Sequence, residues 1–225
     1  MIRYGLVCLV VIGSLAFAGC DDDASQPAPD AAPPPPTMCE WPSGTVGLEN
    51  GEIMAAAGTS WFGYGPGDTE PRTISIEEFF DCDGTHNIDA LLFTTSKFNC
   101  SRCAREAQEL EANIASWRAM GYRIKVITML IDNPAGDRDP NGEACGTWID
   151  TYDLENVYVM GDPTVTFFTA GRFSTPMRAV VDPRDMTIQE IVQGTTPYTT
   201  LLPTAMRNNP DATPVPAADG GAESQ

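Results

Sequence analysis

Two cysteines at a predicted strand–helix junction constrain this chain more than any other feature. The apolar run IDALLFTT at residues 88–95 is typical of a buried central strand. Cys100 and Cys103 follow it, separated by Ser and Arg. Strong helix formers then begin at residue 101, with apolar side chains at helical spacing, and Gly121 is placed to end the helix. The sequence therefore predicts a thiol pair at the first turn of a helix that follows a core strand.

A Cys-x-x-Cys pair has three interpretations: a redox pair that turns over, half of a metal site, or an inert crosslink. A structural zinc ion would need a second pair of ligands, and Cys82 and Cys145 are single. His86, the one histidine of the chain, lies in the turn DGTHN and is interpreted as a solvated loop residue. We therefore expect no metal at the pair.

The N-terminal residues predict export. MIRYGLVCLVVIGSLAFAGC has a basic start, a short apolar run and small residues before Cys20, which is the layout of a secretory signal peptide. Its end, AFAGC, resembles the bacterial lipobox, in which the cysteine becomes the lipidated first residue; the alternative is cleavage without lipid. We expect lipidation at Cys20 and attachment to a membrane through acyl chains. The expected location is the bacterial cell envelope, facing the periplasm or the cell exterior.

Composition divides the chain into four parts. They are a signal peptide at 1–19, a Pro/Ala/Asp-rich tether at 20–37, one domain at 38–207 and a disordered tail at 208–225. The tether and tail lack the apolar side chains needed to offset the entropy of ordering, whereas the middle part is long enough for a sizeable core. A formal net charge of −18 argues against nucleic acid as a partner.

Export makes the remaining cysteines candidates for disulfides. If the Cys-x-x-Cys pair is bridged, Cys39, Cys82 and Cys145 allow one more bridge and leave one free thiol. Spacing alone does not choose among the three pairings. We favour Cys39 with Cys82, because that bridge would fasten the start of the domain to the rest of it.

The apolar segments after the first strand and helix predict a mixed sheet. We expect a strand at 122–132, a helix at 144–154, a short edge or parallel strand at 156–160, a hairpin of 164–171 with 177–182, and a last helix at 187–194 with Thr187 as N-cap and Gly194 at its end. This order predicts an α/β fold with a central mixed β-sheet covered on both faces.

Together, the strand, the Cys-x-x-Cys pair, the helix and the later run GDPTVTFFTAGR resemble the thioredoxin fold, in which helices flank a central mixed sheet in three layers. In that family a proline, often followed by Thr, forms a cis peptide and packs against the redox pair, and the resemblance gives this role to Pro163. TISIEEFFDCDG is similar to the opening segment of the redoxin branch, which includes membrane-anchored thiol-disulfide reductases. Cys103-Ala104-Arg105-Glu106 resembles their Cys-x-x-Glu, and the likeness covers about residues 73–195.

Several positions depart from the family pattern and are candidates for adjusting the thiols. Asn99 stands where the family usually has Trp, and Arg102 adds a positive charge between the cysteines. Asp162, if it approaches Cys100, would oppose the thiolate. Glu106 is either a proton shuttle for the second cysteine or an exposed helix acid that complements the dipole, and we favour the second. The cysteine motif of peroxiredoxins is absent, which argues against peroxidase activity.

The start of a helix stabilises a thiolate, and the thiolate is the nucleophile of disulfide exchange. We therefore expect Cys100 to attack and Cys103 to resolve the mixed disulfide. The expected function is a membrane-anchored thiol-disulfide oxidoreductase that acts on protein thiols or disulfides of the envelope and needs no cofactor beyond its dithiol. The alternative is a non-enzymatic envelope lipoprotein that uses the fold as a binding module, with a structural disulfide.

Overall fold

The computed structural model describes residues 39–164 and 175–214, all of which lie in one compact unit of the chain. The elements are β1 (Ser60–Tyr64), β2 (Arg72–Ser75), the 3-10 helix η1 (Ile76–Phe79), β3 (Ala90–Ser96), α1 (Ser101–Ala119), β4 (Ile124–Leu130), α2 (Gly142–Tyr152), β5 (Val157–Gly161), β6 (Met177–Val181), β7 (Ile188–Gln193) and α3 (Leu201–Asn208). The predicted signal peptide, Cys20 and the tether lie outside the described residues. Within the described residues no helix combines the length and the apolar character needed to cross a bilayer.

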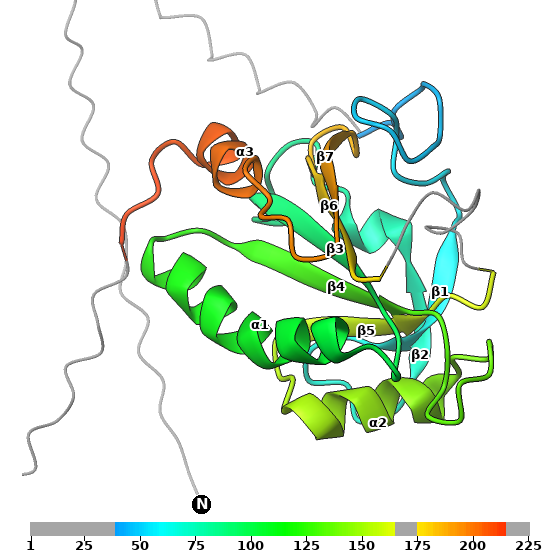
Figure 1. Ribbon diagram of the computed structural model, residues 1–225. Coiled ribbons are helices and arrows are strands. Elements are labelled where there is room, and N and C mark those ends of the chain that lie inside the picture. The colour runs from blue at the N-terminus through cyan, green and yellow to red at the C-terminus, as the bar shows by residue number, and fades with distance from the viewer. Residues whose placement is uncertain (1–38, 165–174, 215–225) are drawn as a thin grey trace, which may run out of the picture. The chain divides into compact units, whose positions relative to one another are not determined.

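The strands form one mixed sheet in the order β2-β1-β5-β4-β3-β6-β7 (Figure 1). β3, β4 and β5 are parallel to one another, and the other neighbouring pairs are antiparallel. Every residue of β3 is buried, as expected for a strand with neighbours on both edges and layers on both faces. The C-terminal end of this central strand leads into the turn that carries the cysteines.

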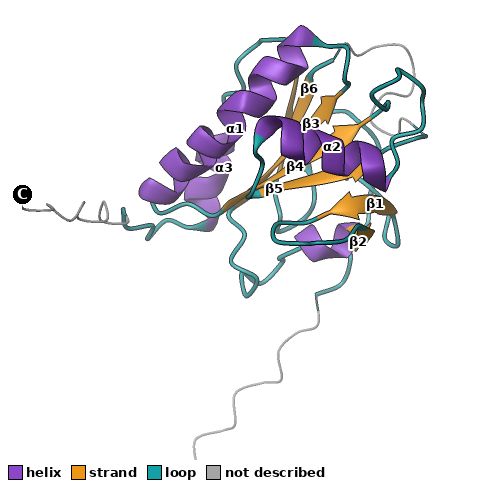
Figure 2. Cartoon of the chain, turned by 90° about the horizontal axis from the view of Figure 1, so that it is seen from below, coloured by secondary structure: helices purple, strands orange, loops and turns teal. Residues whose placement is uncertain are grey.

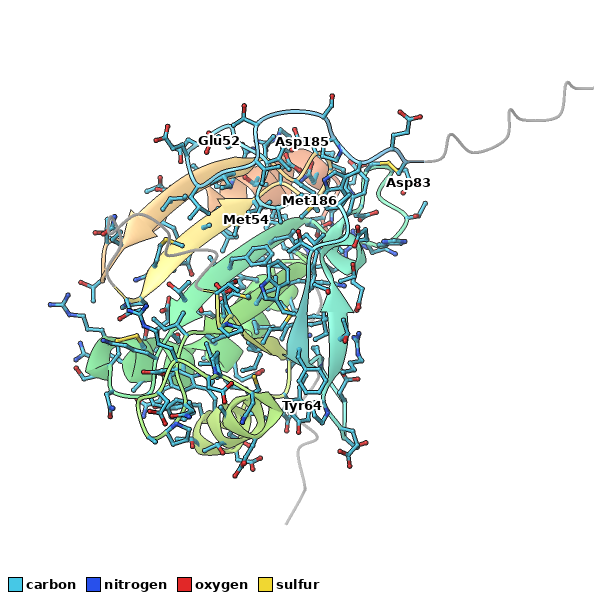
Figure 3. All side chains as sticks on the ribbon, turned by 90° about the vertical axis from the view of Figure 1, so that its right-hand side faces the viewer. Glu52, Met54, Tyr64, Asp83, Asp185 and Met186 are labelled. Carbon is cyan, nitrogen blue, oxygen red and sulfur yellow. A yellow bond between two sulfur atoms is a disulfide. The ribbon has the colours of Figure 1, made fainter. Side chains whose placement is uncertain are left out.

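Two separate cores cover the two faces of the sheet. On one face the helices α1, α2 and α3 pack against β3–β6 (Figure 2), through residues that include Leu110, Trp148 and Leu201. On the other face the segment before β1 and the short η1 cover the sheet, with Phe79 fully buried. Met54 and Met186, labelled in Figure 3, belong to this second core, and the N–H of Met54 donates to the carbonyl of Met186 at 2.9 Å.

The predicted mixed sheet covered on both faces is confirmed. β3, α1, β4 and α2 lie within a few residues of their predicted positions, and Gly121 follows the end of α1 with a φ of +88°, a conformation that favours glycine. β5 is parallel and lies inside the sheet between β4 and β1.

Two predictions for the C-terminal third are wrong. β6 pairs with β3 on one edge and β7 on the other, so neither edge is free for the segment 164–171, most of which lies outside the described residues. The segment 187–194, predicted as a helix, forms β7 instead. Its helical spacing was overridden because the apolar β6 edge offers a full ladder of backbone partners.

The end of the domain also differs from the prediction, because α3 was not expected and the ordered chain continues past residue 207. The side chain of Asn208 donates to Asp182 at 2.8 Å, and that of Asn209 donates to Asp89 at 3.0 Å. Asp89 is fully buried, and the amide of Asn209 adds a hydrogen bond to those that its carboxylate accepts from Arg123. Residues 208–214 therefore lie against the domain.

Candidate active site

The two cysteines sit where β3 gives way to α1. Cys100 is the N-cap residue of α1, and its sulfur accepts a hydrogen bond from the backbone N–H of Cys103 at 3.1 Å. The two residues form a disulfide with a Cα–Cα distance of 5.2 Å. Cys100 is partly exposed, whereas Cys103 is completely buried. Of the two cysteines, only Cys100 is therefore accessible to another molecule.

The charges around Cys100 favour an ionised sulfur. The first turn of α1 contains no acidic residue, so the positive end of the helix dipole is not opposed locally. Arg102 lies between the cysteines and Arg105 follows them, and both side chains are exposed. A thiolate at Cys100 would therefore lie at the N-terminus of α1, with two arginines and no acid in the five residues that follow it.

Glu106, one turn after Cys103, is not the exposed helix acid that the sequence suggested. Its side chain is only 13% exposed, and its Oε1 forms an ion pair with Nε of Arg178 at 2.8 Å. Burial raises the pKa of Glu106 to about 7, although the charge of Arg178 opposes the rise, and Glu109 adds to it. The second carboxylate oxygen has no hydrogen-bond partner among the described residues. Glu106 can therefore exchange a proton near neutral pH, one helical turn from Cys103.

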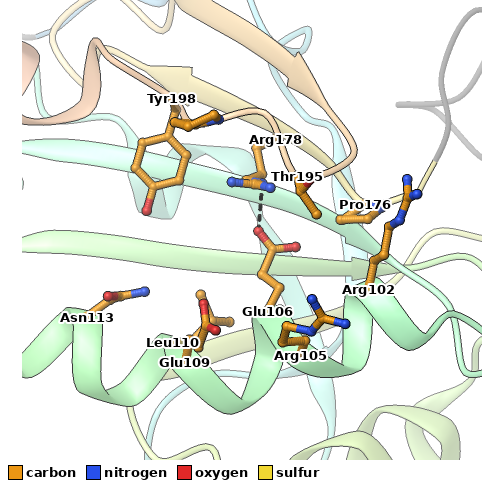
Figure 4. A pocket seen from close by; sticks show the side chains of 11 residues that line it. Arg102, Arg105, Glu106, Glu109, Leu110, Asn113, Pro176, Arg178, Thr195 and Tyr198 are labelled. Carbon is orange, nitrogen blue, oxygen red and sulfur yellow. Dashed lines mark ion pairs between the residues drawn. The ribbon is translucent and has the colours of Figure 1, made fainter.

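A groove of about 430 Å³ runs along α1 from the redox end of the helix (Figure 4). One wall is α1 itself, and the other wall comes from the start of β6 and the segment after β7. Its polar and aromatic lining includes Arg102, Arg105 and Glu106 on α1 and Pro176, Arg178 and Tyr198 on the opposite wall. The guanidinium of Arg178 also lies over the ring of Tyr198, 5.5 Å from its centroid. The groove thus joins the cysteine-bearing helix to a surface that a substrate could occupy.

The prediction that Pro163 carries the cis peptide is wrong. Among the described residues the cis bond is Thr175–Pro176, directly before β6. Pro163 follows β5, which is separated from β3 by β4, whereas β6 is the immediate antiparallel neighbour of β3. Both prolines precede apolar runs, and the sequence pattern alone does not tell which run pairs with the strand that leads to the cysteines.

Asp162 lies at the end of β5 and is fully buried. Its backbone N–H donates to the carbonyl of Leu130 at 2.7 Å, and its carboxylate accepts from the hydroxyl of Thr164 at 3.1 Å. These contacts tie Asp162 to the end of the neighbouring strand β4. They give it a structural role at the C-terminal edge of the sheet.

The remaining cysteines divide into a bridge and a free thiol. Cys39 and Cys82 form a disulfide with a Cα–Cα distance of 5.9 Å, which is the pairing favoured from the sequence. Cys145 is free and completely buried on α2, and burial raises its pKa to about 12. Among residues 39–164 and 175–214, no three His, Cys, Asp or Glu side chains are grouped so that they could hold a metal ion.

Sequence reasoning missed Arg178, Tyr198 and Pro176, which form the second wall of the groove. A signal for Pro176 was present, because Thr175–Pro176 immediately precedes the apolar run MRAVV. Arg178 and Tyr198 carried no local signal. Their importance comes from the antiparallel pairing of β6 with β3, which brings Arg178 opposite Thr94 and onto the side of α1.

Comparison with known proteins gives a likeness of fold only. No protein-family model and no curated protein matches the chain. A solved structure from Chlorobium tepidum, described as a thiol:disulfide interchange protein DsbE, is 16% identical, with a TM-score of 0.47 over 72% of this chain and 99% of that one. The thioredoxin domain of a thiol-disulfide oxidoreductase from Bacteroides vulgatus is 16% identical, with a TM-score of 0.46 over 72% and 98%. A thioredoxin-like protein from Aeropyrum pernix is 15% identical, with a TM-score of 0.44 over 66% and 88%.

The strand order and the placement of the cysteines identify the fold independently of these scores. A parallel β3–α1–β4 unit carries the Cys-x-x-Cys pair at the start of its helix, and a cis-proline leads into the antiparallel pair β6–β7. These are the features for which the sequence resembles the thioredoxin fold, with Pro176 in place of Pro163. The chain therefore has a thioredoxin-like α/β fold.

Proposed function

We propose that this protein is a membrane-anchored thiol-disulfide oxidoreductase of the cell envelope. In the reducing direction the Cys100 thiolate attacks one sulfur of a substrate disulfide and releases the other as a thiolate. The Cys103 thiolate then attacks the Cys100 sulfur and expels the second substrate thiolate. Two electrons pass from the protein to the substrate, the protein is left with the Cys100–Cys103 disulfide, and an external dithiol restores it.

The observation that carries this proposal is the position of Cys100 at the N-cap of α1, partly exposed and bonded to a buried Cys103. A structural crosslink gains nothing from an uncompensated helix N-terminus or from flanking arginines. A working dithiol gains from both, because they stabilise the thiolate that starts the exchange. Glu106, with a pKa of about 7, supports the same interpretation as a group that can supply or remove a proton next to the pair.

The anchor and the domain plan belong to the same proposal. Cleavage before Cys20 and lipidation of its thiol would attach residues 20–37 to a membrane as a tether, with the folded domain beginning near residue 38. Replacing Cys20 by Ser should move the protein from the membrane fraction to the soluble fraction of the envelope. Retention of the Cys20→Ser protein in the membrane fraction would contradict anchoring while leaving the redox chemistry open.

An insulin-reduction assay with dithiothreitol tests the enzymatic claim. Wild-type protein should accelerate insulin precipitation, and Cys100→Ser should reduce the rate to that of dithiothreitol alone. Cys103→Ser should accumulate mixed disulfides with envelope proteins, because the resolving sulfur is missing. If wild type is no faster than Cys100→Ser and no mixed disulfide is trapped, the pair is a crosslink and the chain is a binding module.

A further inference from the structure

The surroundings of the redox pair are basic, although the chain as a whole is strongly acidic. The formal net charge is −18, yet the two charged side chains flanking Cys103 in the first turns of α1 are Arg102 and Arg105. Both are exposed, and neither makes an ion pair with any of the described residues. Two guanidinium groups within five residues of Cys100 and without an ion pair to the described residues are available to a partner.

The charges along the groove change with distance from the cysteines. Arg102 and Arg105 lie at the end of the groove that is nearest the start of α1, as Figure 4 shows. Glu106 comes next, and its charge is matched by Arg178. Glu109 lies further along α1, so the positive charge is concentrated near the sulfur, and the net charge of these five groups is +1 when Glu106 is ionised.

The length of the groove fits a polypeptide. Arg102 and Asn113 both line it, and the helix between them rises about 16 Å at 1.5 Å per residue. An extended chain covers that length with about five residues. A carboxylate carried next to the cysteine of such a segment would reach the arginines, which bind carboxylates through two parallel hydrogen bonds.

We propose that the groove selects polypeptide substrates that carry Asp or Glu within about three residues of the reactive cysteine. The inference rests on the proposed function and adds the substrate class. Arg102 and Arg105 bind the acidic side chain, and the rest of the segment lies along α1 toward Tyr198. Substrates with basic residues next to the cysteine are repelled by the same two side chains.

Three reporter peptides test the selection. Each contains one intramolecular disulfide and differs only in having Glu, Gln or Lys beside both cysteines. The measurement is the rate at which the reduced full-length protein opens each disulfide. The Glu peptide should react about tenfold faster than the Lys peptide at low salt, a difference of about 1.4 kcal/mol, because the two exposed arginines attract one charge and repel the other. The ratio should shrink as ionic strength rises.

Substitutions then assign the selection to the two arginines. Arg102→Gln with Arg105→Gln should bring the Glu-to-Lys ratio to about one, and the corresponding Glu substitutions should invert it. Arg118→Gln, on the exposed far end of the same helix, is the matched control and should leave the ratio unchanged. Because the ratio compares two substrates of one variant, it is insensitive to any change in the reactivity of the thiolate.

The outcomes separate this inference from the proposed function. If all three peptides are opened at equal rates by wild type and not by Cys100→Ser, the protein exchanges disulfides but has no acidic preference. If no peptide is opened by wild type, the proposed function itself fails. If oxidised glutathione is opened faster than the Glu peptide and this depends on the arginines, the site takes small anionic disulfides, and the polypeptide proposal is overturned.

Discussion

The two disulfides of this protein differ in the length of chain that they close and in the residues that surround them. Cys39–Cys82 joins residues 43 positions apart, and its neighbourhood holds the aromatic pair Trp41–Phe80. Cys100–Cys103 joins residues 3 positions apart at the start of α1, with Arg102 between the cysteines and Arg105 after them. The first closes a long loop and belongs to no helix, and the second closes almost no loop. The surroundings of the two bridges therefore fit the proposed division, in which the first fastens the fold and the second takes part in exchange.

The largest expected effect separates the two bonds by activity. Cys100→Ser should lower the exchange rate to the uncatalysed level, whereas Cys39→Ser combined with Cys82→Ser should retain most of the wild-type rate. The reason is that only Cys100 combines exposure with a helix N-terminus. The insulin assay at a temperature where both variants are folded measures this. Comparable losses in the two variants would mean that both bridges serve the same purpose.

Removal of the Cys39–Cys82 bridge should cost more stability than removal of the Cys100–Cys103 bridge, the reverse of the order expected for activity. Loop-closure entropy gives about 4 kcal/mol for a bridge across 43 positions and about 2 kcal/mol for one across 3. The Cys39→Ser/Cys82→Ser protein should therefore lose about twice as much unfolding free energy as the Cys100→Ser/Cys103→Ser protein. Urea unfolding of the oxidised proteins measures both. A larger loss for the second variant would overturn the assignment of the fastening role.

Glu106 lies near the Cys100–Cys103 bridge only, and its proton should make the free energy of unfolding depend on pH. Its pKa is raised from 4.5 to about 7 by burial, so the folded protein holds this proton more tightly than the unfolded chain does. The resulting stability is complete below about pH 4.5 and is lost as the pH rises through about 7, by at most about 3 kcal/mol. Glu106→Gln should flatten this part of the stability profile, as urea unfolding between pH 5 and 8 would show. An unchanged profile would mean that Glu106 is ionised throughout.

Graded reduction should open the bridges in sequence. The N-terminus of α1 and the two arginines stabilise the reduced form of Cys100, which makes that disulfide the easier one to reduce, by on the order of 30 mV. Alkylation after incubation with increasing dithiothreitol, followed by mass spectrometry, identifies which thiols appear first. Simultaneous opening, or Cys39 and Cys82 opening first, would contradict the comparison.

The smallest effect is expected at Cys145. This thiol is buried against β1, and its sulfur lies 4.0 Å from the carbonyl of Phe62. Cys145→Ala should change exchange rates little and cost about 1 kcal/mol of stability. In the native wild type, iodoacetamide should not modify Cys145, because burial raises its pKa to about 12. Rapid labelling would show that the helical face opens around α2.

The parts of the fold that the sequence predicted are those whose signals are local. A continuous apolar run predicts β3, and the helical spacing of apolar residues predicts α1. The two cysteines lie where the first element leads into the second. The helical spacing of residues 187–194 predicted a helix where β7 lies, because the spacing within this segment does not reveal that it pairs with β6. Pro176 was passed over for Pro163 for the same reason, since only the pairing of β6 with β3 places it beside α1. Glu106 was expected to be exposed because Arg178, its partner, comes from a distant strand.

The covalent link at Cys39 has a mechanical consequence. Residues 45–54 add a few backbone contacts to the sheet, among them the bridge between Ile53 and Thr187, and such contacts would peel apart one after another under tension. A pull transmitted through the chain before Cys39 would instead pass across the sulfur–sulfur bond to Cys82 and into the body of the domain. Tension on the chain before Cys39 would therefore reach the domain without first detaching residues 45–54 from the sheet.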